Sequence, residues 1–144
     1  MKGGAVDVLG GLTVNLSDAI KPGTDGIYAL KADGESAKKL ERNPVITVGG
    51  GADKLIQLNG NVAADRDGEI NLTMSNADSY LTGWAHNNTG EGKVGTINLE
   101  LANGSVWNVI SKLDSAGSVL PGDSKVDSLK LDNSVLNMSY AAEN

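Results

Sequence analysis

Three acidic side chains occupy alternate positions in one short segment of the chain: Asp65, Asp67 and Glu69. In an extended chain alternate side chains point to the same face, so these three carboxylates would lie together. Acidic clusters are what Ca²⁺ prefers, and carboxylates also serve the enzymes that cleave polysaccharides on β-helical scaffolds. However, Asp67-Gly68 is a turn signal directly before an apolar strand. The sequence therefore favours a solvated corner over a metal or catalytic site.

The single histidine, His86, follows Trp84 in a polar segment. A lone histidine could act as a general base or a pH sensor, but the chain has no second His and no Cys to complete a metal set. We therefore expect a histidine in a surface loop. Trp84 is expected to be an exposed contact residue. With Asp65 and Asp67 these two residues form the candidate contact surface, and the sequence predicts no catalytic, cofactor-binding or metal-ligating residue.

Two further segments partly match known motifs. Gly122-Asp123-Ser124 resembles the nucleophile block of GDSL-type esterases. That chemistry needs a downstream histidine and a strand-to-helix turn, whereas His86 lies upstream and residues 125–127 lead into another strand. We therefore interpret the segment as a corner. Asp53 belongs to a partial copy of the Ca²⁺-binding nonapeptide of RTX β-rolls, which works only in tandem, so no calcium site is predicted.

The elements that would carry these residues follow from composition and repetition. The chain has 144 residues, enough for one domain with a core. Lys and Arg total 12 against 18 Asp and Glu, which gives a net charge of −6, so no basic stripe is present and a nucleic-acid partner is not expected. Nineteen Gly, no Phe and no Cys indicate a turn-rich fold with an aliphatic interior and no disulfide. No apolar run is long enough to span a bilayer.

Three stretches of the chain resemble one another. They are residues 70–83, 97–109 and 129–138, and each consists of an alternating strand, an Asn/Asp/Gly corner and a second alternating strand that opens with Ser. The starts at 70, 97 and 129 lie 27 and 32 residues apart. Unequal spacing between repeats is typical of stacked coils with loops of variable length.

Period 2 within these strands predicts rows of equivalent side chains. The expected inward rows are Ile70 over Ile97 over Leu129, and Leu81 over Trp107 over Leu136, which places Trp107 in the core. The expected outward amide pairs are Asn71 with Asn98 and Asn108 with Asn137.

Weaker copies of the pattern occur upstream, at residues 12–16, 27–30, 45–48 and 56–62. Only residues 36–42 look helical, with Ser36 as the N-cap and Asn43-Pro44 as the stop. We expect a single β-helix domain over residues 1–144, with the clearest coils at 52–140. Residues 1–51 are expected to form further coils or an irregular cap.

Two all-β architectures suit these strands. In an antiparallel sandwich nothing requires a residue to resemble another 27 positions later. In a parallel β-helix the two would lie one coil apart, at about 4.8 Å. The sequence therefore predicts an all-β parallel β-helix with one short helix at most.

The run LELANGSVWNV, residues 99–109, resembles the recurring "L-x-L-x-N-x-S-x-W-x-V" coil of bacterial autotransporter passenger domains of the pertactin-like and AIDA-like adhesins. Residues 124–138 resemble the coil that follows it, and residues 76–83 the "N-x-S-x-L-x-G" coil upstream. The resemblance covers about residues 56–140. It implies a right-handed parallel β-helix at the surface of a Gram-negative bacterium, tethered to the outer membrane in the full-length protein.

The same resemblance implies a structural stalk or adhesin that is not an enzyme and needs no cofactor. The implied partners are host extracellular matrix, host surfaces, sister bacterial cells and the protein's own C-terminal translocator barrel. Loops 82–94 and 113–127 would supply variable surface, and open ends would allow end-to-end self-association. The opening residues lack an apolar signal segment, so we expect a piece of a longer passenger. The alternative is a polysaccharide lyase or hydrolase that uses the acidic cluster.

Overall fold

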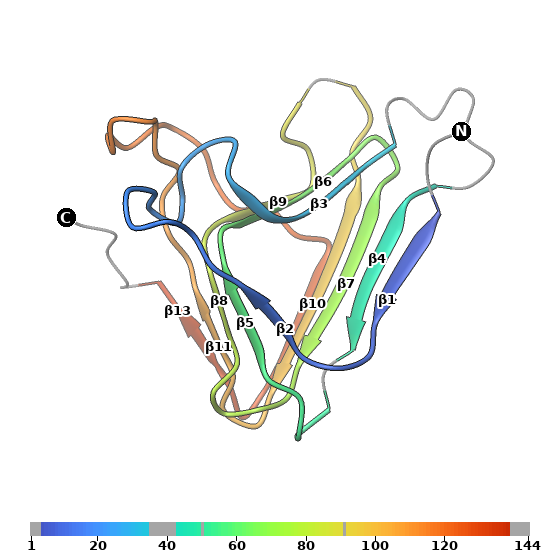
Figure 1. Ribbon diagram of the computed structural model, residues 1–144. Helices are drawn as coiled ribbons and strands as arrows, with labels where there is room; N and C mark the ends of the chain where they lie inside the picture. The colour runs from blue at the N-terminus through green and yellow to red at the C-terminus, as the bar shows by residue number, and fades with distance from the viewer. Residues whose placement is uncertain (1–3, 35–42, 50, 91, 139–144) are drawn as a thin grey trace.

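The computed structural model describes residues 4–34, 43–49, 51–90 and 92–138. The predicted helix at 36–42 lies outside these residues. Within them the chain is all-β, with thirteen strands in three parallel sheets (Figure 1). No helix in this part of the chain is long and apolar enough to cross a membrane.

Successive strands from β1 to β11 are distributed among the three sheets in turn, and β12 then returns directly to the first sheet (Figure 1). The first sheet contains β1 (Ala5–Val8), β4 (Val45–Gly49), β7 (Glu69–Met74), β10 (Thr96–Ala102) and β12 (Ser128–Asp132). The second contains β2 (Leu12–Val14), β5 (Ile56–Asn59), β8 (Tyr80–Thr82), β11 (Val106–Asn108) and β13 (Val135–Asn137). The third contains β3 (Tyr28–Asp33), β6 (Asn61–Asp65) and β9 (Ala85–His86). The N-terminal strands β1, β2 and β3 therefore extend the same sheets as the later repeats.

The register between repeats was predicted correctly in three places. Ile70 is paired with Ile97, and Trp107 is paired with both Leu81 and Leu136. The outward amides also meet as expected: Asn98 Nδ2 donates to Asn71 Oδ1 at 2.9 Å, and Asn137 Nδ2 donates to Asn108 Oδ1 at 3.1 Å.

The predicted position of Leu129 is wrong by two residues, because Leu129 is paired with Leu99 rather than with Ile97. The place opposite Ile97 is taken by Asp127. Its backbone N–H donates to the carbonyl oxygen of Ile97, and its Oδ1 accepts from the Ile97 N–H, both at 2.8 Å. This double contact with Asp127 sets the register of β12.

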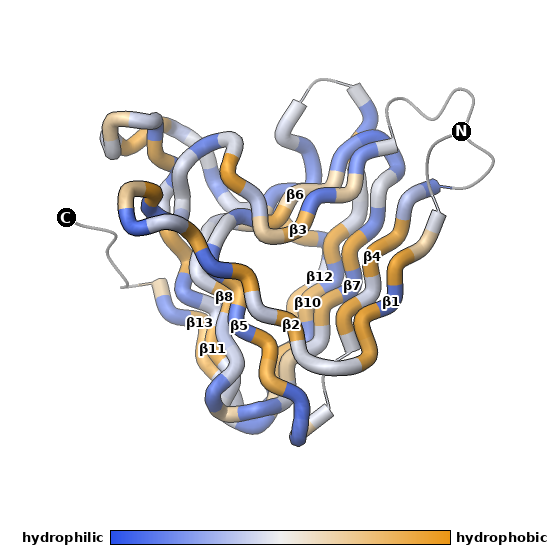
Figure 2. Tube along the Cα trace, in the orientation of Figure 1, coloured by the Kyte–Doolittle hydropathy of each residue, from blue (hydrophilic) through white to orange (hydrophobic). Residues whose placement is uncertain are grey.

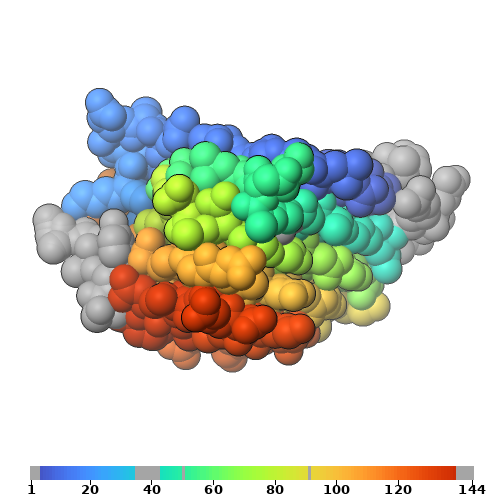
Figure 3. All heavy atoms as spheres, turned by 90° about the horizontal axis from the view of Figure 1, so that it is seen from below, coloured from blue at the N-terminus to red at the C-terminus, as the bar shows by residue number. Residues whose placement is uncertain are grey.

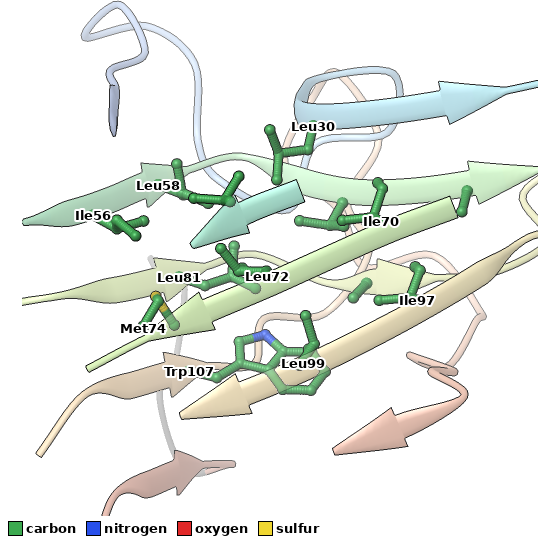
Figure 4. Close-up of a cluster of buried hydrophobic side chains, with 14 of the residues drawn as sticks. Leu30, Ile56, Leu58, Ile70, Leu72, Met74, Leu81, Ile97, Leu99 and Trp107 are labelled. Carbon is green, nitrogen blue, oxygen red and sulfur yellow. The ribbon is translucent and has the colours of Figure 1, made fainter. Parts of the chain in front are cut away.

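Inward side chains form continuous apolar rows across the sheets. One row of the first sheet runs Val8, Val48, Leu72, Leu99, Leu129, and one row of the second runs Val14, Leu58, Leu81, Trp107, Leu136. Figure 2 shows hydrophobic and hydrophilic positions alternating along these strands. The rows meet in one core between the sheets (Figure 4). No single repeat could bury its apolar side chains alone, so the core exists only because the repeats are stacked.

Two corner residues explain the shared motif of the repeats. Asn103 and Asn133 both adopt a left-handed backbone, with φ of 57° and 56°, a conformation that Asn tolerates better than most residues. The serine that follows reaches back to the preceding repeat: Ser105 Oγ donates to the Met74 carbonyl and Ser134 Oγ to the Leu101 carbonyl, both at 3.0 Å. The Asn and the Ser of the motif therefore make the turn and hold it to its neighbour.

Another corner requires glycine because adjacent repeats approach closely there. A Cβ atom on Gly68 would overlap the backbone of Ala32, and one on Gly95 would overlap the backbone of Ala64. Gly68 precedes β7 and Gly95 precedes β10, so the same contact occurs in two successive repeats. Glycine at this place lets the repeats stack without a gap.

Trp107 provides a test of this core. Its side chain is only 3% exposed and its Nε1 donates to the Gly83 carbonyl at 2.9 Å. Trp107→Ala should lower the free energy of unfolding by about 3–5 kcal/mol, because it leaves a cavity and an unpaired carbonyl. Urea unfolding followed by circular dichroism measures the change.

Val135→Ala is the matched control, since Val135 lies on the adjacent strand and is 49% exposed. It should change the free energy of unfolding by about 0.5 kcal/mol or less. An equal effect of the two substitutions would contradict the burial of the indole.

Candidate functional site

A pocket of about 320 Å³ opens beside β9. Its walls come from the third sheet and the loop after it, from the segment that follows β11, from the corner before β12, and from the end of β13. The lining residues are Trp84, His86, Asn88, Thr89, Val109, Ile110, Ser111, Lys112, Gly122, Asp123, Ser124 and Met138. We call it the β9 pocket.

Trp84 lies in the wall of the β9 pocket and is only 4% exposed. The expectation of an exposed contact residue is therefore wrong. Its Nε1 donates to the Gly23 carbonyl at 2.9 Å, and its ring meets the Tyr28 ring edge-on, with the centroids 5.8 Å apart. The partners lie more than 50 positions away in the sequence, so a local pattern gave no sign of this burial.

The burial of Trp84 depends on a segment that crosses from β2 to β3. Asp25 N–H donates to the Leu113 carbonyl at 2.7 Å, and Leu113 N–H donates to the Gly23 carbonyl at 2.8 Å. Thr24 and Leu113 form a parallel bridge. This crossing segment, residues 20–27, thus joins the start of the chain to the segment after β11.

Asn61 holds the crossing segment and Trp84 together, a role that sequence reasoning missed. The side chain is fully buried. Its Nδ2 donates to the carbonyls of Thr24 and Ile27 at 2.8 and 2.9 Å, while its Oδ1 accepts from the Trp84 N–H at 3.0 Å. A polar amide directly before three apolar residues of the same strand was the available signal, since buried polar groups need partners.

His86 is half-buried in the wall of the β9 pocket rather than exposed at the tip of a loop. Its Nδ1 accepts a hydrogen bond from the Asn88 N–H at 2.9 Å. Burial lowers the pKa of His86 below its usual 6.5, and the positive charge of Lys125 lowers it further, although Asp65 acts in the opposite direction. The imidazole is therefore neutral near pH 7, with its proton on Nε2.

The Gly122-Asp123-Ser124 segment follows a bend at Pro121 and then runs beside β9. Lys125 N–H donates to the Ala85 carbonyl at 2.8 Å, and Ser124 Oγ accepts from the Ala85 N–H at 3.1 Å. The stacking brings Asp123 and Ser124 to the same pocket as His86. Asp123 and Ser124 lie far from His86 in the sequence, so their order along the chain gave no sign that the three residues share a pocket.

The acidic cluster does not converge on one point. Asp65 is 4% exposed, so the predicted solvated corner is wrong for this residue. Its carboxylate accepts hydrogen bonds from Thr89 N–H and Oγ1 at 2.5 and 2.6 Å and from Gly90 N–H at 3.3 Å. Asp65 thus anchors the loop after β9, which forms part of the pocket wall.

The other two acidic residues have separate partners. Asp67 lies in the predicted turn, with φ of 70°, and forms an ion pair with Lys93 at 2.9 Å. Glu69 accepts from Asn71 Nδ2 at 2.8 Å. Among the described residues no group of three or more His, Asp or Glu side chains is placed to hold a metal ion.

The expected surface loops are more structured than predicted. The 82–94 segment contains β9, and Leu113 in the 113–127 segment is buried against the crossing segment. Both segments contribute to the β9 pocket, so the variable surface predicted from the sequence coincides with the site described here.

The histidine gives a pH-dependent prediction. Because the pKa of His86 is lowered in the folded state, the unfolded chain binds the proton more readily, and stability should fall as the pH decreases through 6.5 toward the folded pKa. Unfolding measured from pH 8 to pH 5 in wild type and His86→Gln checks this. The two proteins differ only at residue 86, so the difference between their pH profiles reports on His86.

We expect wild type to lose stability relative to His86→Gln over that range. The chain has one histidine, so its NMR titration is unambiguous and should give a pKa below 6.5. A titration midpoint at or above 6.5 would contradict the burial of the imidazole.

Comparison with known proteins gives no match: no protein-family model, no curated protein and no solved structure corresponds to this chain. The stacked strands and the β9 pocket are therefore the observations from which a function can be proposed.

Proposed function

We propose that the three parallel sheets are the faces of a right-handed parallel β-helix, and that the chain is a passenger segment of a bacterial autotransporter. Its role would be that of a structural stalk or adhesin displayed at the cell surface and tethered to the outer membrane. The observation that supports this proposal best is the in-register stacking of equivalent side chains from one repeat to the next.

The stacking suits a mechanical role. Each repeat adds a strand to a sheet and lies against the repeats before and after it, as the successive layers in Figure 3 illustrate. Parallel ladders, apolar rows and corner serines all run along the stacking direction. Such an array resists bending because every layer is hydrogen-bonded to its neighbours. A rod of this kind can project a binding surface away from a membrane.

The surface of the rod supports the proposed contacts. The net charge of −6 keeps the exterior hydrophilic and disfavours nonspecific attraction to anionic glycans. The loops after β9 and β11 project from the stacked sheets (Figure 1). The proposed partners are host matrix, host surfaces or sister cells, together with the translocator barrel of the full-length protein.

The two ends of the stack support self-association with a second copy. The edge strands are β1 and β2 at one end and β12 and β13 at the other. Inward apolar side chains are uncovered at both ends, with Val6 57% and Leu131 44% exposed. Unpaired strand edges readily pair with another chain, so we propose end-to-end contact between copies.

Surface display tests the proposed function. The chain is fused between a signal peptide and an autotransporter translocator barrel in a Gram-negative host. We expect intact cells to expose the chain to added protease, and to adhere to matrix-coated surfaces or to one another more than cells that carry the barrel alone.

Trp107→Ala is the control, because it weakens the stacked core without altering the exterior. Display without any gain in adhesion or aggregation would overturn the adhesin role. Turnover of oligogalacturonates by the purified chain, lost in Asp67→Ala, would instead favour the polysaccharide lyase.

Self-association has its own test. Sedimentation of the purified chain should show an average mass that rises with concentration. Val6→Lys places a charge on the apolar end formed by β1 and should reduce the association, whereas Val94→Lys, at a 55% exposed position outside the edge strands, should not. A monomer at every concentration, or equal behaviour of the two variants, would contradict end-to-end contact.

A further inference from the structure

We infer that copies of this chain join head to tail, with β1 and β2 of one copy paired in parallel with β12 and β13 of the next, and with Lys130 opposite Asp7 of the next copy. The inference rests on the proposed end-to-end contact and adds its polarity and its register. Each copy then uses its two ends in different contacts, so the product is an open rod rather than a closed dimer.

The first observation is the direction of the strands. Every pairing between named strands in the described part of the chain is parallel. The two edges of the first sheet are β1 and β12, and those of the second are β2 and β13. A copy added in the same orientation therefore continues both sheets with the ladder that the chain already uses. Two like ends could meet only if one copy were turned over, which would make each new ladder antiparallel.

The placement of the sheets also distinguishes the two orientations. The three sheets lie on different sides of the shared core (Figure 1). A copy in the same orientation places the first sheet on the first and the second on the second. Turning a copy over reverses the order of the sheets around the core, so at most one sheet then meets its own counterpart. Head-to-tail contact is therefore the arrangement that extends both five-stranded sheets at once.

The apolar side chains of the edge strands set the register. The inward side chains of β12 are Leu129 and Leu131, and Leu131 is 44% exposed. Those of β1 are Val6 and Val8, and Val6 is 57% exposed. With Leu129 opposite Val6 of the next copy, the remaining leucine lies opposite the remaining valine, because inward side chains recur at every second residue. The register with Leu129 opposite Val8 would instead place Val6 beside the carboxylate of Asp127.

The same register gives the second sheet apolar contacts. Turning the next copy about the stacking axis moves its β1 and β2 together, so β2 takes a corresponding position on β13. Leu136 then lies opposite Leu12 of the next copy, and Met138 lies opposite its Val14. Met138 is 68% exposed in the single chain, and this contact would cover it. Both sheets thus bury apolar side chains in one arrangement.

The outward side chains of the first sheet carry opposite charges at the two ends. In this register Lys130 of β12 lies opposite Asp7 of β1 in the next copy. The Lys130 side chain is 72% exposed, and its Nζ lies 3.8 Å from Glu100 Oε2 on β10. Asp7 would add a second carboxylate on the other side of the ammonium group. Joining two β1 ends would instead bring two Asp7 carboxylates together, which is destabilising.

Blocking one end at a time tests the polarity by sedimentation of the purified chain. Val6→Lys blocks the β1 end and Leu131→Lys blocks the β12 end, both at partly exposed positions, and circular dichroism should show that both variants fold. We expect wild type to form species larger than a dimer. Each variant alone should stay monomeric, because every contact needs one end of each kind. An equimolar mixture should form a dimer and nothing larger, because each variant retains the end that the other lacks.

The outcomes separate this inference from the proposed end-to-end contact. A dimer formed by either variant alone would show contact between like ends and would overturn the head-to-tail polarity, while end-to-end association remained. A mixture that stays monomeric while wild type associates would also overturn it. A wild-type chain that is monomeric at every concentration would overturn the end-to-end contact itself, and the polarity with it.

Exchanging the charges tests the register. Asp7→Lys and Lys130→Asp should each weaken association by about threefold or more, because each places like charges opposite one another. The double variant should associate more tightly than either single variant, because the pair is restored with its charges reversed. Asp53→Lys is the matched control, since it changes the net charge equally at a side chain that is 82% exposed and outside the edge strands. A double variant no tighter than the single ones would overturn the register.

Discussion

The structure depends on one constraint: each inward side chain must lie on another apolar side chain in the repeat beside it. Leu72, Leu99 and Leu129 satisfy it in one sheet, and Leu81, Trp107 and Leu136 in another. The remaining features follow, because stacking also brings the backbones into hydrogen-bonding distance. Glycine is then needed where the repeats approach most closely, and serine oxygens are placed against the carbonyls of the preceding repeat.

The regular part of this arrangement could be predicted from sequence. Alternation identified the strands and their faces, and similarity between repeats identified the amide pairs and the burial of Trp107. The register of Leu129 could not be predicted, because Asp127 replaces an apolar residue at the position opposite Ile97. Trp84 and Asp65 were assigned too much exposure because distant or loop residues cover them, and periodicity carries no information about such partners.

The β9 pocket lies where the regular stacking is interrupted. β9 has only two residues, and the segment after β11 leaves the strand pattern to meet the crossing segment. Polar groups gather at this interruption, whereas the regular rows are occupied by apolar side chains. It is physically reasonable that the pocket lies apart from the apolar rows, since closely packed rows of side chains leave no room for a ligand. It also explains why sequence reasoning found His86 and Trp84 but neither the pocket nor Asn61 and Asn88.

The crossing segment has a consequence for how the molecule comes apart. In an array held only by adjacent layers, the terminal layers can peel away one at a time. Here residues 23–25 are bound to Leu113 and Trp84, which belong to much later parts of the chain. Detaching the crossing segment must therefore break bonds to residues that precede β9 and follow β11. We therefore expect the crossing segment and the segment after β11 to come apart together rather than one after the other.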